Sequence, residues 1–559
     1  MRKHWPFYLY LICWASYFTV FWLHVVSIDE QGNLLVGQAN MWADWAWHFT
    51  LSHSIAERGW PLTDSPLLAD SALSYPFFSS LLSAILIKLS VPTHWSHILP
   101  SLMFNLLLIW ALYYFFLTLL KRPSIAIIGA CLFLLNGGLG FVHFFEALAQ
   151  AQFSLDLLFA PPQQYTHLPD QNIFWISIVN SMIIPQRSLT MGLPLTLLAL
   201  SWVYQLAFNP VEQAQKRFYL QRAKWCSAIL ILGMMPIIHS HSFLAAFVIL
   251  ACWSLFDLIS QRSILMERIR FWLPIALLIS CIALPMISLF LLNNIGESFI
   301  RWYPGWYARE KQINWLQFWL NNWSFIPLLA LVGTRICLMR KKIHALRDWL
   351  PFWLLFAAVN LWIFQPWIWD NTKLLLWVAI GFSALAAQCL YSFWQHIWFN
   401  QYQQWQKIVN RICTICLLII CCLSGFLDVY SNSRLSLHTY TLYTAEELAL
   451  AQWAKQQTPL NSRWLISDKH NHWVLNLTGR QALMGYSGWL WSHGYDYSET
   501  ALAVKSLYST ADPSLIEKYN LDYLVIGPEI RREYPEAERI FRQQLELVHS
   551  TKNYQIFKY

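Results

Sequence analysis

Apolar stretches long enough to cross a lipid bilayer recur along most of this chain, and they restrict its fold more than any other feature. A transmembrane helix needs ~20 apolar residues, and only helices or closed barrels satisfy every backbone polar group inside the bilayer. Charged residues make up 12% of the chain, against about 25% in soluble domains. The sequence therefore predicts a polytopic α-helical membrane protein of about 11 transmembrane helices. The predicted spans are residues 6–28, 97–120, 124–145, 188–208, 225–240, 242–260, 271–292, 324–340, 349–365, 373–396 and 411–430.

Lysine and arginine between the spans indicate the orientation, because short basic loops stay in the cytoplasm. We place the N-terminus in the cytoplasm and take a further apolar run, 75–91, as a helix that does not cross. The cytoplasmic segments then hold 17 Lys and Arg against 3 acids, and the outer loops hold 7 against 12. Counting 75–91 as a crossing would put the basic loops outside. The cytoplasmic segments are 1–6, 121–123, 209–224, 261–270, 340–348 and 397–411, and the outer loops are 29–96, 146–187, 293–323 and 366–373.

The polar tail, 431–559, must then lie outside, which in a Gram-negative cell is the periplasm. It alternates helix-like runs (444–456 and 534–543) with strand-like runs (463–467, 522–527 and 554–559), which is typical of a small α/β domain. The sequence thus predicts a transmembrane domain over 1–430, with surface helices in its first outer loop, and an extracytoplasmic α/β domain over 431–559. The bilayer is the expected surrounding, and no nucleic-acid partner is expected.

The first outer loop carries the most informative stretch, "MWADWAWHFTLSHSIAERGWP" at residues 41–61. Asp44 and His48 are four residues apart, so they share one face of a helix. A short amphipathic helix on the membrane surface fits this spacing. The structural alternative is a solvated loop acid that happens to lie near a histidine.

Two further polar groups lie at predicted outer ends of spans. Gln186 and Arg187 come just before the 188–208 span, against the positive-inside bias, and Pro185 fixes the approach; interfacial snorkelling is the alternative. His239 and His241 lie in "MMPIIHSHSF" (234–243), between two short spans. A His-x-His spacing can bind metal, but no carboxylate is close in sequence, so we predict a tight outer turn without a metal.

Asp370, Asn371 and Lys373 form a polar group between two apolar spans. Ionisable residues that pair at a membrane boundary are functional candidates, although an Asp–Lys pair can also simply cap a helix. Arg301 lies among aromatic residues in the loop 293–323, which can cover an anion site or merely lie on the membrane. All these polar residues fall on the outer side under a topology that was set by different residues, the cytoplasmic Lys and Arg.

A membrane-anchored sugar phosphate suits such a set of residues. Arginine and lysine bind phosphate, and fixed cations stabilise the charge that develops on a leaving phosphate where water is scarce. The attacking hydroxyl needs a base, and the Asp44 carboxylate can accept its proton. One carboxylate suffices, because the lipid phosphate leaves as an anion without being protonated, and direct displacement inverts the anomeric carbon.

The whole chain resembles bacterial integral-membrane glycosyltransferases of the GT-C superfamily, which includes aminoarabinose transferases, protein O-mannosyltransferases and oligosaccharyltransferases. The resemblance rests on the acid-bearing loop 43–78 after the first span, on the step from Tyr75 to Pro76 before a second surface helix, and on "QRS" (186–188) and "WDNTK" (369–373). It implies that Asp44 takes the position of the essential aspartate. It further implies a polyprenyl-phosphate sugar donor, a cell-envelope glycan, lipid or protein acceptor, and a place in the bacterial inner membrane.

The chain departs from the better-known members of this superfamily at three points. The first loop has Asp44-x3-His48 instead of paired acids, and the tail has no WWD-type motif, which argues against N-linked transfer. Instead, 479–497 carries aromatic residues with Trp489 and His493, which we assign to the acceptor side; packing onto the membrane domain is the alternative. Few acids cluster on the outer side, so we expect no cofactor and no essential metal, although a divalent ion is used in one branch.

In sum, we predict a catalytic pair of Asp44 and His48, with Gln186, Arg187, Arg301 and Lys373 binding the lipid phosphate and Tyr75, His239, His241, Asp370 and Asn371 in support. The competing hypothesis is a transporter or flippase of a lipid-linked or anionic precursor, because charges inside a membrane also mark transport paths. No inverted repeat with paired broken helices supports that hypothesis. A non-catalytic membrane scaffold is a third possibility.

Overall fold

The structure is a computed structural model that describes residues 5–208, 215–292, 300–395, 404–435 and 439–559. Parts of three predicted cytoplasmic segments (1–4, 209–214 and 397–403), of the outer loop 293–323 (293–299) and of the tail (436–438) lie outside the described residues. The chain divides into two compact units, which we describe one at a time. Unit 1 comprises residues 1–21, 101–286 and 300–435, and unit 2 comprises residues 22–100, 287–299 and 436–559.

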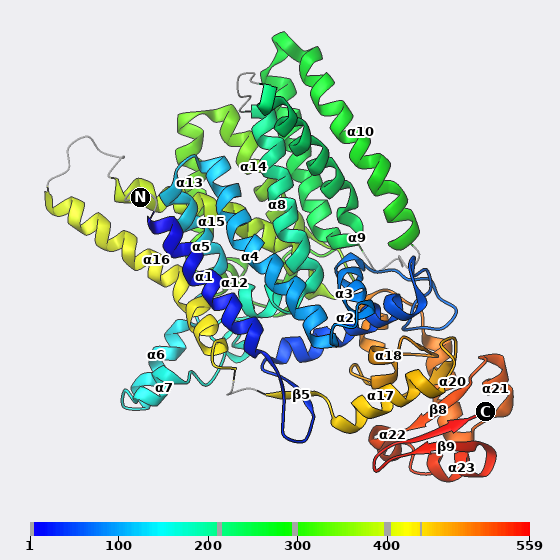
Figure 1. The fold of residues 1–559 in the computed structure, drawn as a ribbon. Coiled ribbons are helices and arrows are strands. Elements are labelled where there is room, and N and C mark those ends of the chain that lie inside the picture. Colours follow the sequence, from blue (N-terminus) through cyan, green and yellow to red (C-terminus); the bar gives the residue numbers. More distant parts are fainter. Residues whose placement is uncertain (1–4, 209–214, 293–299, 396–403, 436–438) are drawn as a thin grey trace. The chain divides into compact units, whose positions relative to one another are not determined.

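Unit 1 is a bundle of long apolar helices (Figure 1). Its most central helix, α15 (Thr372–Trp394), is buried along nearly its whole length, because it is apolar on every side. Around it, α8 (Arg187–Phe208) packs on α9 (Gln215–Ser260), and α13 (Ile326–Arg340) and α14 (Lys342–Leu361) contact α15. The remaining helices are α1 (Trp5–His24), α4 (Thr93–Leu120), α5 (Pro123–Leu134), α6 (Phe141–Gln150), α7 (Leu155–Phe159), α10 (Leu265–Phe290), α11 (Trp306–Glu310), α12 (Trp315–Trp323) and α16 (Gln404–Asn432).

Several predicted spans are broken or joined in the structure. Within the described residues, seven helices are long and apolar enough to cross a membrane, or eight if the bent pair of α12 and α13, at 94°, counts as one span. The predicted span 124–145 is divided into α5 and α6, and 225–240 and 242–260 belong to one interrupted helix, α9. The predicted number of 11 is therefore not confirmed, because hydropathy detects apolar runs but not the breaks within them.

Short elements connect the long helices of unit 1. Two two-residue strands, β3 (Arg301–Trp302) and β4 (Trp362–Ile363), pair antiparallel, with Arg301 opposite Ile363. A turn of π-helix, η2 (Ile178–Ile183), precedes α8, and a 3-10 turn, η4 (Ile368–Asn371), leads into α15. Two further 3-10 turns are η1 (Pro169–Gln171) and η3 (Arg262–Ile264).

Unit 2 combines the first loop with the tail. Its first part carries β1 (Val26–Ile28), β2 (Leu34–Val36), α2 (Ala39–Arg58) and α3 (Phe78–Lys88). At 1.5 Å per residue, the 11 residues of α3 extend ~16 Å, which is too short for a ~30 Å bilayer core. This agrees with the prediction that 75–91 does not cross. β2 pairs antiparallel with both β1 and β5 (Tyr440–Tyr443), so the first loop and the tail share one sheet.

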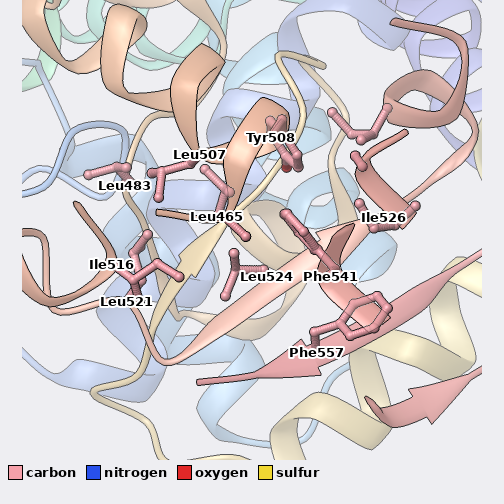
Figure 2. Packing of buried hydrophobic residues seen from close by; sticks show 13 residues of the cluster. Leu465, Leu483, Leu507, Tyr508, Ile516, Leu521, Leu524, Ile526, Phe541 and Phe557 are labelled. Carbon is pink, nitrogen blue, oxygen red and sulfur yellow. The ribbon is translucent and has the colours of Figure 1, made fainter. Parts of the chain in front are cut away.

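The tail contains a second, mixed sheet of five strands in the order β7-β6-β8-β10-β9. β6 is parallel to β7 and β8, whereas β10 is antiparallel to β8 and β9. Strands β6, β8 and β10 lie within the three predicted strand-like runs. The sheet packs on a hydrophobic core that includes Leu465, Leu524 and Phe557 (Figure 2). Its strands are β6 (Arg463–Leu465), β7 (Gln481–Ala482), β8 (Tyr523–Ile526), β9 (Glu546–Ser550) and β10 (Gln555–Lys558).

The helices of the tail cover this sheet and reach the first loop. α17 (Ala445–Gln457) begins with a capping box in which Thr444 and Glu447 bind each other's backbone N–H groups. α18 (Trp473–Thr478) packs on both α17 and α2. The other helices are α19 (Ser487–Ser492), α20 (Ser498–Thr510), α21 (Pro513–Lys518), α22 (Pro528–Glu533) and α23 (Ala537–Gln544).

Candidate functional site

In unit 1, the predicted turn at His239 and His241 is a break inside α9. His239 has extended backbone angles (φ −158°, ψ 97°) in an otherwise helical run. Its Nδ1 accepts a hydrogen bond from the backbone N–H of Ser242 at 3.3 Å and lies 2.7 Å from the Ser242 Oγ. A side chain that accepts from the N–H three residues later is an N-cap, so His239 starts the second helical segment of α9.

The first two turns of α15 lie against this break. Trp377 donates from Nε1 to the Oγ of Ser242 at 3.2 Å, which joins α15 to the His239 cap. The ammonium of Lys373 is close enough to act electrostatically on the imidazoles of His239 and His241. The two imidazole centroids are 5.5 Å apart. Four side chains that are predicted from the sequence therefore gather here from two distant segments: His239, His241, Asp370 and Lys373.

Asp370 forms an ion pair with Lys373, with Oδ1 and Nζ 2.9 Å apart. The side chain of Asp370 is 10% exposed and that of Lys373 24%, so the pair is largely withdrawn from water. The predicted pairing is thus present. Asn371 has a structural role, because its amide donates to the carbonyls of Val359 and Trp362 and accepts from the N–H of Phe364, which holds the turn before α15 in place.

Sequence reasoning missed Gln365, whose Nε2 lies 2.9 Å from the Nε2 of His241. It also missed Ser242 and Trp377. Ser242 carried a detectable signal, because its spacing of three residues from His239 is that of an N-cap contact. Gln365 and Trp377 carried none, because their partners lie more than 100 positions away in the sequence.

Arg187 is the first residue of α8 and is buried. Five residues later, at Gly192, a Cβ would lie only 2.5 Å from the Cβ of His239. Five residues correspond to ~7.5 Å of helix, so Arg187 begins about one and a half turns from the α9 break. Gln186 precedes it and is half-buried, with its carbonyl accepting from Thr190. Arg301 lies in β3 and is exposed.

In unit 2, Asp44 and His48 lie in α2, as the helical spacing predicts. Asp44 is half-buried and His48 is buried. The Nδ1 of His48 lies 3.3 Å from the Oγ of Ser80 in α3, so the second surface helix orients this imidazole. Trp47 is on the same side of α2 and contacts the ring of Tyr75, with centroids 5.3 Å apart.

Trp489 and His493 of the tail, which we assign from the sequence to the acceptor side, lie next to Trp47. Their ring centroids are 5.7 and 5.3 Å from that of Trp47, respectively, and the His493 ring is 4.7 Å from Tyr75. Unit 2 therefore brings together four of its sequence-predicted residues, since the His48 ring centroid is also 6.4 Å from that of Tyr75, and Asp44 lies one helical turn before His48 in α2. Nearby, burial lowers the pKa of His470.

Among the described residues, there is no group of three or more His, Cys, Asp or Glu that could hold a metal ion. The residues in place thus do not fit the divalent ion that one branch of the GT-C superfamily uses. The two imidazoles at the α9 break have a lysine ammonium beside them, which repels a cation.

No protein-family model matches the chain, and no curated protein matches its sequence. Solved structures do match its fold. An oligosaccharyltransferase from Archaeoglobus fulgidus, tethered with an acceptor peptide containing the NVT sequon, aligns at TM-score 0.54 and 11% identity over 98% of this chain and 72% of that one. The archaeal oligosaccharyltransferase AglB from the same organism, in complex with an inhibitory peptide and a dolichol-phosphate, aligns at 0.58 and 11% over 96% and 71%.

ArnT from Cupriavidus metallidurans, bound to undecaprenyl phosphate, aligns at TM-score 0.49 and 11% identity over 99% of this chain and 98% of that chain. At such identities the similarity concerns the fold, and the two oligosaccharyltransferase matches carry it. This chain is a polytopic membrane protein with the fold of the GT-C glycosyltransferases.

Proposed function

We propose that this protein is a membrane glycosyltransferase that moves a sugar from a polyprenyl-phosphate-linked donor to a cell-envelope acceptor on the outer side of the bacterial inner membrane. The observation that carries the proposal is the GT-C fold with a half-buried acid, Asp44, on the helix that follows the first apolar helix. The dolichol-phosphate bound to the similar archaeal enzyme supports a lipid phosphate as the donor's carrier.

Asp44 acts as the base in the proposed reaction. It accepts the proton of an acceptor hydroxyl as that oxygen attacks the anomeric carbon of the sugar. The bond between this carbon and the phosphate oxygen breaks, and the electron pair leaves with the polyprenyl phosphate. The new glycosidic bond forms on the opposite face, so the anomeric configuration is inverted. The imidazole of His48, held by Ser80, positions the acid one helical turn away.

The cations of unit 1 bind the donor's phosphate. Lys373, fixed at the start of α15, and Arg187, at the start of α8, each place a positive charge in a region with few water molecules. There, a fixed cation stabilises the charge on the leaving phosphate more than it would in water. His239 and His241 support Lys373 from the α9 break, and Gln186 and Arg301 bind the outer part of the lipid headgroup.

Purified protein in liposomes tests this proposal against a panel of polyprenyl-phosphate sugars. We expect wild type to consume at least one donor, and Asp44→Asn to slow transfer by roughly 100-fold or more. Its affinity for undecaprenyl phosphate should stay unchanged. Asp64→Asn is the matched control, because Asp64 is an exposed acid of the same loop, and it should transfer normally. Equal rates for wild type and Asp44→Asn would contradict the assignment of the base.

A wild type that carries labelled lipid phosphate across the bilayer but transfers no sugar would instead support the flippase hypothesis. The proposed orientation has its own measurement. Reporter fusions after residue 123 and after residue 559 should report the cytoplasm and the outer side, respectively. The opposite pattern would contradict an outer active site.

A further inference from the structure

A continuous row of aromatic side chains lies next to Asp44 in unit 2, and the transfer step itself uses none of them. Consecutive ring centroids along this row are 5.9, 5.5, 5.7, 5.3 and 4.7 Å apart. The members, in spatial order, are His470, Tyr486, Trp489, Trp47, His493 and Tyr75. We call this set the aromatic row.

Three segments that are distant in sequence build the aromatic row. Trp47 comes from α2, three residues after Asp44, Tyr75 from the loop before α3, and the other four from residues 470–493 of the tail. Trp47 is buried, whereas the other five are partly exposed. A packing core is fully buried instead, as are Phe541 and Phe557 in the tail (Figure 2). The aromatic row is therefore a surface that offers ring faces and edges.

Polar groups accompany these rings. Tyr486, which is partly exposed, carries a phenolic hydroxyl at one end of the aromatic row. Beside Tyr486, the exposed carboxylate of Asp468 accepts from the backbone N–H of Ser487 at 2.8 Å and from its Oγ at 2.6 Å. Two oxygens fixed in this way keep lone pairs for a ligand.

Saccharides match this mixture of groups. A pyranose has apolar C–H faces that stack on aromatic rings and hydroxyl edges that bind polar side chains. An apolar peptide or a lipid tail would use the rings but not the exposed carboxylate of Asp468 or the hydroxyl of Tyr486. A phosphate would meet the negative charge of Asp468. A neutral sugar chain is the ligand class that uses both features.

Gly488 has a specific part in this surface. A Cβ at this position would lie 2.6 Å from the Tyr486 ring, which is closer than van der Waals contact. The missing side chain thus lets the Tyr486 ring lie over the start of α19. A substitution here displaces one ring of the aromatic row without removing any aromatic residue.

We propose that the aromatic row binds a neutral saccharide, and that the acceptor of this protein is therefore a glycan or the glycan part of a larger molecule. The second clause rests on the proposed function, since only a transferase has an acceptor. The site follows from the rings and their polar neighbours alone. Its place next to Asp44 would bring an acceptor hydroxyl towards the base.

The experiment measures binding without any donor. Full-length protein in lipid nanodiscs is titrated with neutral tetrasaccharides of glucose, N-acetylglucosamine, mannose and galactose, and binding is followed by saturation-transfer NMR. We expect wild type to bind at least one of them. Trp489→Leu and Gly488→Ala should each weaken that binding roughly five-fold, because one aromatic contact is worth about 1 kcal/mol.

Trp491→Leu is the matched control, because Trp491 is an exposed tryptophan on the same helix and outside the aromatic row. It should bind within about two-fold of wild type. Absence of saccharide binding by folded wild type would overturn the proposal, and so would an equal loss in Trp491→Leu and Trp489→Leu. Preferential binding of apolar peptides over all four sugars would overturn it too.

The two proposals fail separately. Saccharide binding by a protein that consumes no donor would support the aromatic row as a saccharide site and contradict only the transfer reaction. Donor-dependent transfer without saccharide binding would support the transfer reaction and contradict only the saccharide site. Asp44→Asn should bind saccharide as wild type does while losing transfer.

Discussion

The ion pair of Lys373 with Asp370 allows a direct test of whether the lysine binds phosphate or merely caps α15. At the 2.9 Å between Nζ and Oδ1, two charges attract by about 6 kcal/mol at an effective dielectric constant of 20. Removing one partner of a buried pair reduces stability by about 3–5 kcal/mol, because the other charge is left behind. With Lys373 at 24% exposure, we expect the lower end, about 3 kcal/mol.

If the pair is purely structural, Lys373→Gln and Asp370→Asn change the affinity for undecaprenyl phosphate in the same direction. If Lys373 binds phosphate, only Lys373→Gln weakens it. In the structural case, Lys373→Gln and Asp370→Asn both destabilise α15 and both weaken binding. In the phosphate case, Lys373→Gln removes a charge-assisted hydrogen bond worth about 1.5–3 kcal/mol. Affinity for undecaprenyl phosphate then falls roughly 10- to 150-fold. Asp370→Asn releases the ammonium from its competitor, so affinity stays the same or rises.

Dissociation constants for undecaprenyl phosphate, measured in nanodiscs, distinguish the two cases, and unfolding midpoints in mild detergent are recorded in parallel. We expect both single variants to lose stability, the double variant to regain part of it, and only the variants without Lys373 to lose affinity. If Asp370→Asn and Lys373→Gln lose affinity in parallel with stability, the lysine is a helix cap and the proposed phosphate site is wrong.

Three further predictions concern stability and packing. Asp428 is buried in α16 and accepts three hydrogen bonds from the segment 165–166; Asp428→Ala should lower the unfolding free energy by about 3 kcal/mol or more, and Asp428→Asn by less, as denaturant titration would show. Gly192→Ala should press its new methyl group on the Cβ of His239, 2.5 Å away. We expect a loss of about 1–3 kcal/mol together with weaker binding of undecaprenyl phosphate. Burial and Lys469 lower the pKa of His472 from 6.5 to about 3, so the unfolded chain takes up this proton first as pH falls. The part of the unfolding free energy that depends on neutral His472 is fully present above about pH 6.5. It declines below that pH, and about 2 kcal/mol is lost at pH 5. His472→Asn should make that part of the pH dependence of the unfolding midpoint disappear.

Local pattern was sufficient wherever one segment determines its own structure. The four-residue spacing of Asp44 and His48 predicted their helix, and the strand-like runs of the tail contain β6, β8 and β10. The start of α17 is also encoded locally, because Thr444 and Glu447 form a capping box. In each case, the period of the pattern and the capping residue are properties of a few consecutive residues.

The breaks in the membrane helices follow from packing between distant segments, which explains why the predicted spans differ from the structure. Between α12 and α13 the chain turns at Ser324, which has φ +47°. Between α5 and α6 it passes Gly138, at φ +69°, where a Cβ would lie 2.2 Å from the Asn321 carbonyl oxygen. Gly138 lies inside the predicted span 124–145, so hydropathy continues across it, whereas Ser324 is the first residue of the predicted span 324–340, so this break coincides with a predicted boundary. The partners of His241 and Ser242, Gln365 and Trp377, come from such distant packing too.

The tail is more than an appendage to a membrane domain, because it holds the helix that carries the proposed base. Asn476 donates to the carbonyl of Ala46 at 2.8 Å, and the indole of Trp42 donates to the carbonyl of Thr441 at 2.9 Å. Asp44 lies midway between these two points of α2. A base works only if it is held within about 0.5 Å of its productive position. A two-point attachment around one turn of helix supplies that restraint.

The division of the chain into units has a chemical meaning under the proposed function. The base and the aromatic row belong to the unit that contains the tail, and the cations that bind the lipid phosphate belong to the unit of long apolar helices. The acceptor side, which must differ between proteins that modify different glycans, is thus built by the first loop and the tail. The donor side, which must recognise a phosphate at the membrane, is built by helix ends. Such a division would let the tail and its aromatic residues change with the acceptor while α8, α9 and α15 keep the same phosphate chemistry.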